Sequence, residues 1–304
     1  MRRALLAMTI LTAPGSAAAF EYPTVGGHEG EIDVEARFEG HLGELHPTSR
    51  PTTHQPADIK VFATGAGVTF GNLGPFLDLH LRLDGGYLIA GPEAVTRADD
   101  DLPIGTVFHP SDRGGWVRAT VGANLVHTPR LAFGAFIEGT VPIDVDLAKF
   151  SNLRLHYAGG GTRLGVHLTD PGGLLRLTSL SRLFVGTGTF AGAAQQNAQA
   201  ELESLVYLDL LRWVLPWRAG VGVGPRFAAD LNSHVNDAYR QAYGTVSPDL
   251  VAGDRVQQQQ LAGVVRAYLF VTPHAALEGS FDGQISGEDA RATRRFTAAL
   301  RVAF

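Results

Sequence analysis

The sequence contains no cysteine, which excludes a disulfide framework, a thiolate metal site, a cysteine nucleophile and a lipidated N-terminal cysteine. Charged residues are also scarce, at 18% of the 304 residues, against about 25% in average proteins. The basic residues form no runs and the formal net charge is -5. Nucleic acid is therefore not expected as a partner.

Long apolar runs are missing as well. After residue 20, the longest stretch without Asp, Glu, Lys or Arg is 183–200, and it contains several Gln, Asn and Gly residues. A transmembrane helix needs about 20 predominantly apolar residues, so a helical membrane protein is not expected. Hydrophobic residues still make up 45% of the chain, whereas disordered chains combine low hydrophobicity with high charge. The composition therefore predicts a folded chain.

Residues 1–19 have the pattern of a cleaved export signal. Arg2 and Arg3 form a positive start, 4–13 is an apolar core, and three alanines at 17–19 precede an expected cleavage site before Phe20. The core is too short for a membrane anchor. We expect the mature chain, 20–304, to form a single domain.

The mature chain alternates between apolar and polar residues with a period of two. In 31–42, the even positions are mainly apolar and the odd positions are charged, which is typical of a strand with one apolar face. In 58–70 either face could be the apolar one, and in 153–169 the phase slips at Gly159-Gly160-Gly161, which indicates a bulge. The pattern predicts twelve strands, at 29–44, 58–70, 75–90, 113–126, 131–142, 153–169, 174–190, 199–213, 217–229, 254–271, 274–286 and 293–304.

The connections between these segments alternate in length. Tight turns are expected at 71–74, 127–130, 170–173, 214–216 and 272–273, and longer links near 45–57, 91–112, 143–152, 191–198, 230–253 and 286–292. Alternating short turns and long loops are the layout of a transmembrane antiparallel up-and-down β-barrel. We therefore expect an all-β fold of about twelve strands, with an ordinary soluble β protein as the alternative.

The last strand carries the sharpest signal. Its alternate residues are apolar and end on an aromatic carboxy-terminal residue: Phe296, Leu300, Val302 and Phe304. At this point the chain resembles bacterial outer-membrane β-barrel proteins as a class, porin-like proteins among them. The resemblance implies a Gram-negative outer membrane, outer-membrane lipids as partners, and these four residues as the signal read by the barrel-assembly machinery.

In a membrane barrel the apolar face meets lipid and the charged face lines the lumen. The expected lumen acids are Glu31, Asp33, Glu35, Glu39, Asp78, Asp84, Glu138, Glu201, Glu203, Asp209, Glu278 and Asp282. The expected lumen bases are Arg37, Arg82, Arg118, Arg163, Arg176, Arg182, Arg218, Arg226, Arg266, Arg295 and Arg301. Because the two signs nearly balance, ion pairs across the lumen are favoured. Trp213, Trp217, Tyr268 and Phe304 suit an interfacial aromatic girdle.

Two functions follow equally from this interior: a passive channel for small polar solutes, or a salt-bridged structural barrel. The alternative is a surface-exposed adhesin or ligand-binding barrel that acts through the loops 91–112 and 230–253. An outer-membrane enzyme ranks third, so no catalytic activity is expected, and no cofactor or metal either.

The weak candidates for chemistry have ordinary explanations. Asn232-Ser233-His234 is the nearest approach to a catalytic group, but adjacent loop residues need not face one another. His41, His46, His54 and Asp58 are irregularly spaced for a metal site, and Asp99-Asp100-Asp101 lacks an EF-hand pattern. The glycines at 159–161 and at 220, 222 and 224 fit no phosphate-binding fingerprint.

Overall fold

The computed structural model describes residues 32–45, 53–55, 57–74, 77–90, 93–96, 106–109, 113–128, 130–143, 158–169, 174–190, 193–210, 219–231, 259–272, 274–288 and 290–304. Regular structure in these ranges is entirely β-strand. Across the same ranges, no helix has the length and apolarity needed to cross a membrane. The expected export signal, 1–19, lies outside the described residues.

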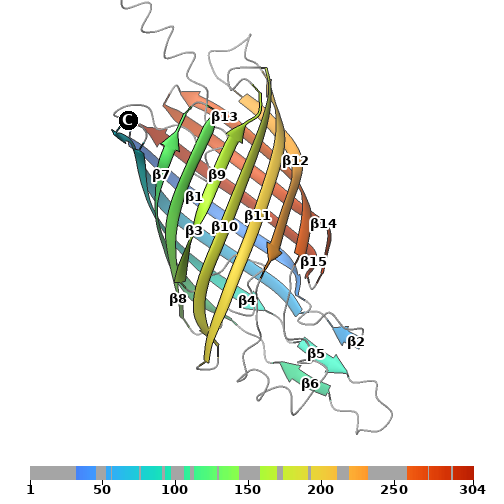
Figure 1. Ribbon diagram of the computed structural model, residues 1–304. Coiled ribbons are helices and arrows are strands. Elements are labelled where there is room, and N and C mark those ends of the chain that lie inside the picture. Colours follow the sequence, from blue (N-terminus) through green and yellow to red (C-terminus); the bar gives the residue numbers. More distant parts are fainter. Residues whose placement is uncertain are drawn as a thin grey trace, which may run out of the picture.

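Twelve antiparallel strands close into one barrel (Figure 1). This confirms the expected all-β barrel and its strand number. The strands, in chain order, are β1 (Ile32–Leu45), β3 (Ala57–Gly74), β4 (Leu77–Ala90), β7 (Arg113–His127), β8 (Leu131–Ile143), β9 (Ala158–His167), β10 (Leu175–Phe190), β11 (Ala193–Leu210), β12 (Ala219–Asp230), β13 (Gln259–Thr272), β14 (Ala275–Glu288) and β15 (Ala290–Ala303).

The first and last strands complete the closure. β1 pairs with β15 along its whole length, from Asp33 opposite Ala303 to Leu45 opposite Ala290. At the end of the ladder, the backbone of Ile32 and Phe304 exchanges two hydrogen bonds, of 3.2 and 2.9 Å. An open edge would leave backbone groups unsatisfied in lipid, so this seam is the feature that makes a membrane barrel possible.

Three short strands form a separate sheet outside the barrel, in the order β2-β5-β6. They are β2 (Thr53–Gln55), β5 (Glu93–Thr96) and β6 (Thr106–His109). Figure 1 places them beyond the end of the barrel opposite the carboxy terminus. The sequence pattern gave no sign of them, because segments of three or four residues are too short to establish an alternation.

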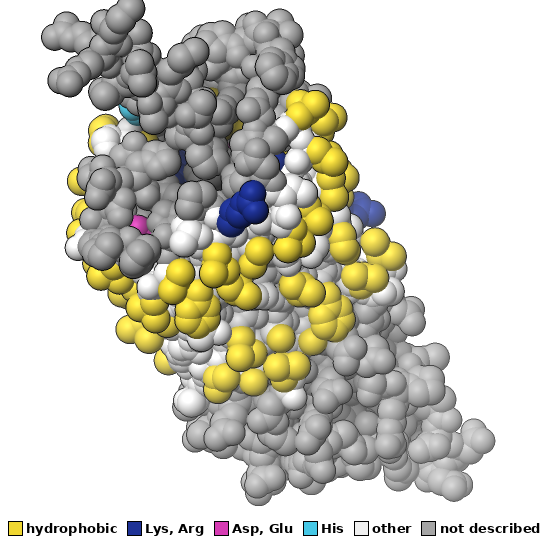
Figure 2. Space-filling view, turned by 45° about the horizontal axis from the view of Figure 1, so that its top comes forward, with side chains coloured by type: hydrophobic (Ala, Val, Ile, Leu, Met, Phe, Trp, Pro, Cys, Tyr) yellow, Lys and Arg dark blue, Asp and Glu magenta, His cyan; other side chains and the backbone are white. Residues whose placement is uncertain are grey.

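The alternation in the sequence matches the two faces of the wall. Along β8, exposed and buried residues alternate without interruption from Leu131 to Glu138. The exposed positions over the whole barrel are mostly Leu, Val, Ile and Phe, and Figure 2 shows them as a broad hydrophobic surface over the visible wall. Exposed apolar side chains outside and buried polar ones inside are the reverse of a soluble protein, as expected for a barrel in lipid.

Three expectations about the strands were wrong. The tight turn expected at 71–74 belongs to β3, which continues to Gly74 and pairs it with Leu77 of β4. The expected bulge at Gly159-Gly160-Gly161 is absent, because β9 keeps a constant register with both β8 and β10. The expected long links at 191–198 and 286–292 are tight connections, since β10 ends at Phe190 where β11 begins at Ala193, and β14 ends at Glu288 where β15 begins at Ala290. Polar residues there continue the ladder after the apolar alternation has ended, with Gln195 opposite Gly188.

Candidate functional site: the barrel interior

The interior is lined by arginines and carboxylates. Among the described residues, ten arginines and ten carboxylates lie on the inward-facing phase of the strands. The arginines are Arg37, Arg82, Arg118, Arg163, Arg176, Arg182, Arg226, Arg266, Arg295 and Arg301. The carboxylates are Asp33, Glu35, Glu39, Asp78, Asp84, Glu138, Glu201, Glu203, Glu278 and Asp282. Glu31, Asp209 and Arg218 were also expected here; Glu31 and Arg218 lie outside the described residues, and β11 includes Asp209 with no described side chain.

Contacts between strands that are not neighbours show that these side chains meet inside the barrel. Arg163 on β9 lies 2.9 Å from Nδ1 of His80 on β4, although β7 and β8 separate the two strands in the wall. Arg226 on β12 lies 3.1 Å from Asp282 on β14, across β13. The side chains of opposite sign therefore compensate one another across the lumen, as burial of charge requires.

One network runs through β4, β7, β8 and β10. Asp84 accepts hydrogen bonds from Nε of Arg82 at 2.8 Å and from Nη2 of Arg118 at 3.0 Å. On the same side of the barrel, Arg182 donates to both carboxylate oxygens of Glu138 at 3.3 Å. Asp84 holds two arginines at once, because its two oxygens can accept from separate guanidinium groups.

A second network joins β11, β12, β13, β14 and β15. Asp282 lies 2.6 Å from Nη2 of Arg295 and is also contacted by Arg226. Arg226 reaches Glu201 at 3.5 Å. The neighbouring pair, Arg266 and Glu203, is joined at 2.8 Å. All of these side chains are almost fully buried, so the arginines are locked into place by carboxylates that would be costly to remove.

The seam carries its own ion pair. Arg301 pairs with Asp33 across the junction of β15 and β1, as expected when the inward faces of the first and last strands pair in antiparallel order. Antiparallel pairing of the two inward faces predicts Arg295 near 35–39, but its partner in the register is His41 and its carboxylate is Asp282 on β14. The two strands are flush at both ends, with Ile32 opposite Phe304 and Leu45 opposite Ala290, and this register places Arg295 two residues further along β1.

Aromatic rings fill much of the remaining interior, which the sequence alone did not predict. Trp116, Phe136, Phe184, Tyr207 and Tyr268 are all buried on inward positions. Apolar residues accompany them, including Val61, Leu88, Leu180, Leu205 and Val264. Tyr268 was expected in an interfacial girdle; it lies inside instead, because its position on β13 has the same phase as Arg266. Trp213 and Trp217 lie outside the described residues.

Each aromatic cluster lies over glycines of a neighbouring strand. The rings of Tyr268 and Tyr207 occupy the space where side chains at Gly220 and Gly222 of β12 would stand. Arg176 reaches over this strand, lies 5.3 Å from the Tyr207 ring centroid and donates to the Tyr268 hydroxyl at 2.6 Å. The glycines therefore have a packing role, because they make room for two rings that pack beneath an arginine.

The same arrangement recurs on β9. Phe136 and Phe184 stack with their centroids 6.3 Å apart, over the space left by Gly159 and Gly161. Arg182 lies 4.5 Å above the Phe136 ring. The glycine run, which the sequence suggested was a bulge, is a flat platform for two rings. Aromatic residues on the strands next to these glycines are the sequence signal that could have indicated this arrangement.

The residues that the resemblance implies as an assembly signal lie on the outward phase of β15. Leu300 is 43% exposed and Phe304 is 73% exposed. Phe296 covers Gly40 of β1 and packs on Phe38 at a centroid distance of 5.8 Å. Val302 lies opposite Val34. These four residues therefore form part of the outer surface beside the seam.

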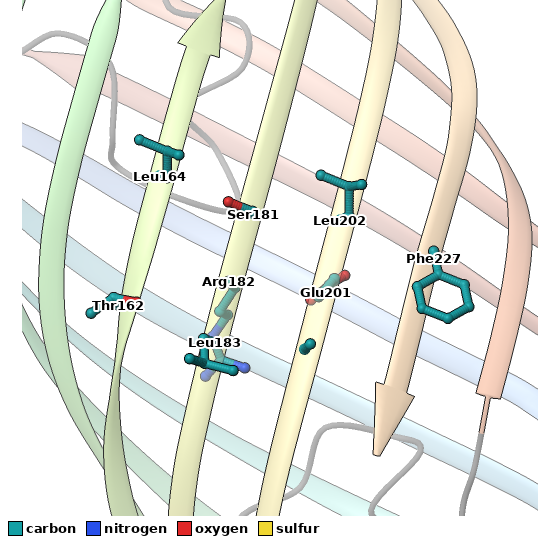
Figure 3. Close-up of a pocket in the computed structure, with 9 residues that line it drawn as sticks. Thr162, Leu164, Ser181, Arg182, Leu183, Glu201, Leu202 and Phe227 are labelled. Atoms are coloured by element: carbon teal, nitrogen blue, oxygen red, sulfur yellow. The ribbon is translucent and has the colours of Figure 1, made fainter. Parts of the chain in front are cut away.

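A shallow pocket of about 330 Å³ lies in the wall of β9 to β12 (Figure 3). Ser181 lies opposite Leu164 and Leu202, and Leu202 lies opposite Phe227. Because the serine is smaller than its neighbours, a depression opens between larger apolar side chains. Outward-facing residues form most of its lining, and the inward-facing Arg182 and Glu201 also contribute to it.

The weak candidates for chemistry gain no support. Residues 232–234, 99–101 and His46 lie outside the described residues, and His54 and Asp58 lie on β2 and β3 with no described side chains. His41 points into the barrel, where it contacts Glu39. Within the described ranges, no three His, Cys, Asp or Glu residues are grouped as a metal site would require.

No family model matches the chain, and no curated protein matches it. Solved structures do. An outer-membrane channel from Pseudomonas putida F1 has a TM-score of 0.55 and 10% identity, over 93% of this chain and 98% of that one. The β domain of the Bordetella autotransporter BrkA has a TM-score of 0.54 and 10% identity, over 90% and 99%. At this identity the likeness is one of fold, and the chain has the fold of bacterial outer-membrane β-barrels.

Proposed function

We propose that this chain resides in a bacterial outer membrane and forms a narrow passive channel for small polar solutes. The observation that carries the proposal is the charged lining. The chain is poor in charge, yet ten arginines and ten carboxylates lie on the described inward face, while the outward face is apolar. A lining of this kind favours water and polar solutes over lipid-like ones.

The interior also sets the expected width. Twelve strands lie between the eight of a filled barrel and the 16–18 of an open porin. Most inward side chains are buried against one another, but Arg82, Arg118, Arg182 and Arg301 keep 16, 13, 12 and 14% of their side-chain surface exposed. Solvent therefore reaches part of the interior, and we expect a small conductance.

Channel recording in a planar bilayer tests this function. The protein, extracted from the outer-membrane fraction, should give discrete, small and stable conductance steps. A matched preparation of the protein unfolded before reconstitution should give none. Correctly folded protein that inserts but never conducts would overturn the channel and leave the salt-bridged structural barrel as the explanation.

A ligand-binding barrel is the second candidate, and the β2-β5-β6 sheet favours it. The sheet joins the link between β1 and β3 to the link between β4 and β7, so two separate connections form one folded surface beyond the barrel. Replacing 93–109 with a short Gly-Ser linker should abolish cell-surface binding if the sheet recognises a ligand. Under the channel proposal, the same variant keeps its conductance.

The outer wall supports membrane lipids as partners. The pocket over Ser181 is walled by Leu164, Leu202 and Phe227, which offers apolar contacts of the kind a lipid acyl chain makes. We propose no catalytic activity and no cofactor for the barrel.

A further inference from the structure

We infer that four inward arginines, Arg82, Arg118, Arg163 and Arg182, form an anion-binding patch that makes the lumen select anions over cations. This inference rests on the proposed channel function and names its solute class. The total charge of the interior differs from the charge that a solute in the lumen meets.

The total charge of the described lining is balanced, but its distribution is not. The inward faces of β4, β7, β8, β9 and β10 carry five arginines against three carboxylates. They are Arg82, Arg118, Arg163, Arg176 and Arg182 against Asp78, Asp84 and Glu138. One wall of the barrel therefore has an excess of positive charge, and the opposite wall has the matching excess of negative charge.

The arginine side chains of this wall are also more exposed than the carboxylates that they contact, which increases the positive charge that a solute meets. The Arg82 and Arg118 side chains are 16 and 13% exposed, whereas that of Asp84, which both arginines contact, is 3% exposed. Arg182 is 12% exposed and Glu138 is 7% exposed. The short carboxylates lie against the wall and the long arginines reach past them. A solute at this wall therefore meets the guanidinium groups of Arg82, Arg118 and Arg182 first, while Arg163, which is 4% exposed, contributes its charge rather than an accessible surface.

Two of the arginines are direct cross-strand neighbours. Arg163 and Arg182 face each other in the register of β9 and β10, and like charges in this position repel each other. An anion between them would relieve that repulsion. Arg163 also contacts the neutral acceptor Nδ1 of His80 at 2.9 Å, which holds its guanidinium in the interior.

The acids nearest the patch also have arginine partners elsewhere in the interior. Glu201 lies opposite Arg182 on β11, but it is shared with Arg226 at 3.5 Å. Glu39 pairs with Arg37 and His41. The patch also contains only arginine, whose planar fork binds carboxylate and phosphate through paired hydrogen bonds and stays charged at any accessible pH. Small carboxylates and inorganic phosphate are the ligands that this chemistry fits.

Reversal potentials in a potassium chloride gradient give the first test. The reversal potential of the parent channel should lie toward the chloride equilibrium potential, which corresponds to a chloride-to-potassium permeability ratio clearly above one. The double variant R82Q/R182Q should bring this ratio close to one, while R82K/R182K, which keeps the charge, should restore most of it. The matched control is R294Q, because Arg294 is an exposed residue on the outward phase of β15; it should leave the ratio unchanged.

Phosphate binding gives the second test and needs no conductance. Inorganic phosphate added to the folded protein in detergent should change the fluorescence of Trp116, whose ring lies 5.2 Å from the Arg118 guanidinium. R82Q/R182Q should bind phosphate at least several-fold more weakly, and a gel shift on boiling verifies that each variant is folded.

Conducting channels that prefer potassium, or that keep their anion preference in R82Q/R182Q, would overturn the patch but not the channel. Absent conductance with intact phosphate binding would overturn the channel but not the patch, and absence of both would overturn both.

Discussion

At the scale of single residues, glycine and aromatic side chains are arranged as matched pairs. Gly86 on β4 lies opposite Trp116 on β7, and the Trp116 indole fills the space where a side chain at Gly86 would stand. Ring-over-glycine contacts of this kind fix the register of neighbouring strands. They also explain how a barrel with so many buried charges keeps a well-packed interior.

Substituting Gly86→Ala should therefore destabilise the barrel. The new methyl group must displace the indole, and overpacking of a filled interior costs about 1–3 kcal/mol. The free energy of unfolding in urea, measured for protein in lipid vesicles, checks this. The control is Gly85→Ala, whose Cβ would have only the Trp116 carbonyl oxygen nearby, at 4.0 Å; it should be neutral or slightly stabilising. Equal stability of the two variants would show that the indole moves without cost.

These pairs mark the limit of what the sequence predicts at the residue scale. The inward phase of the arginines could be read from alternation alone, because a strand has a period of two. The partner of each arginine could not, since Arg163–His80 and Arg176–Tyr268 join strands separated by two others. The glycines at 159–161 gave a misleading signal, because a platform for rings and a bulge use the same residue type.

At the scale of elements, apolar alternation predicts where strands cross lipid better than where they end. The expected strand at 131–142 is β8, Leu131–Ile143, almost residue for residue. The expected strand at 199–213 is β11, Ala193–Leu210, which starts six residues earlier. Its first residues, Ala-Ala-Gln-Gln-Asn-Ala, have no apolar face to detect. Hydrogen bonding to β10 alone extends the strand there.

The last strand offers a test of how the barrel is assembled. Phe304 is 73% exposed, so its ring contributes little to the packing of the folded barrel. Its backbone does contribute, through the two hydrogen bonds with Ile32. Phe304→Ala removes only the ring, and deletion of Phe304 removes the ring and the backbone pairing.

Both variants should insert poorly in cells if the assembly machinery reads the terminal ring. Refolding of purified Phe304→Ala into detergent should stay close to normal, because burial of a complete Phe side chain is worth only about 1.5–3 kcal/mol and this one is largely exposed. The measurement compares the amount of heat-modifiable protein in the outer-membrane fraction with the yield of refolding in vitro. Normal insertion of Phe304→Ala in cells would remove the ring from the signal.

At the scale of the whole molecule, the barrel places its charges where a soluble protein places its core. Closure makes this possible, because each of the twelve barrel strands is paired on both sides and the barrel has no open backbone edge to meet lipid. The ion pairs then meet across the lumen, and the apolar residues are left for the outer wall. Fold, orientation of the faces and closure follow from the sequence pattern; the width of the lumen depends on how arginines and rings pack, which the pattern does not contain.

The closure can be tested directly because the chain has no cysteine of its own. Ala36 on β1 lies opposite Leu300 on β15, and Ala298 lies two residues away from that position. Directly opposed residues in an antiparallel pair have Cα atoms about 4.5–5.5 Å apart, within the range for a disulfide, whereas diagonal neighbours are about 7–8 Å apart. The pair Ala36→Cys/Leu300→Cys should therefore oxidise readily in the folded barrel, and Ala36→Cys/Ala298→Cys should oxidise poorly. All three positions lie on the outward phase, so the charged interior is undisturbed.

The disulfide would join the first and last strands, and so close the chain between them into a loop. After boiling, this looped chain migrates differently from the linear chain on a gel, and it returns to the linear position on reduction. Preferential oxidation of the Ala298 pair would show that the seam is shifted by two residues, and failure of both pairs would show that β1 and β15 are not joined.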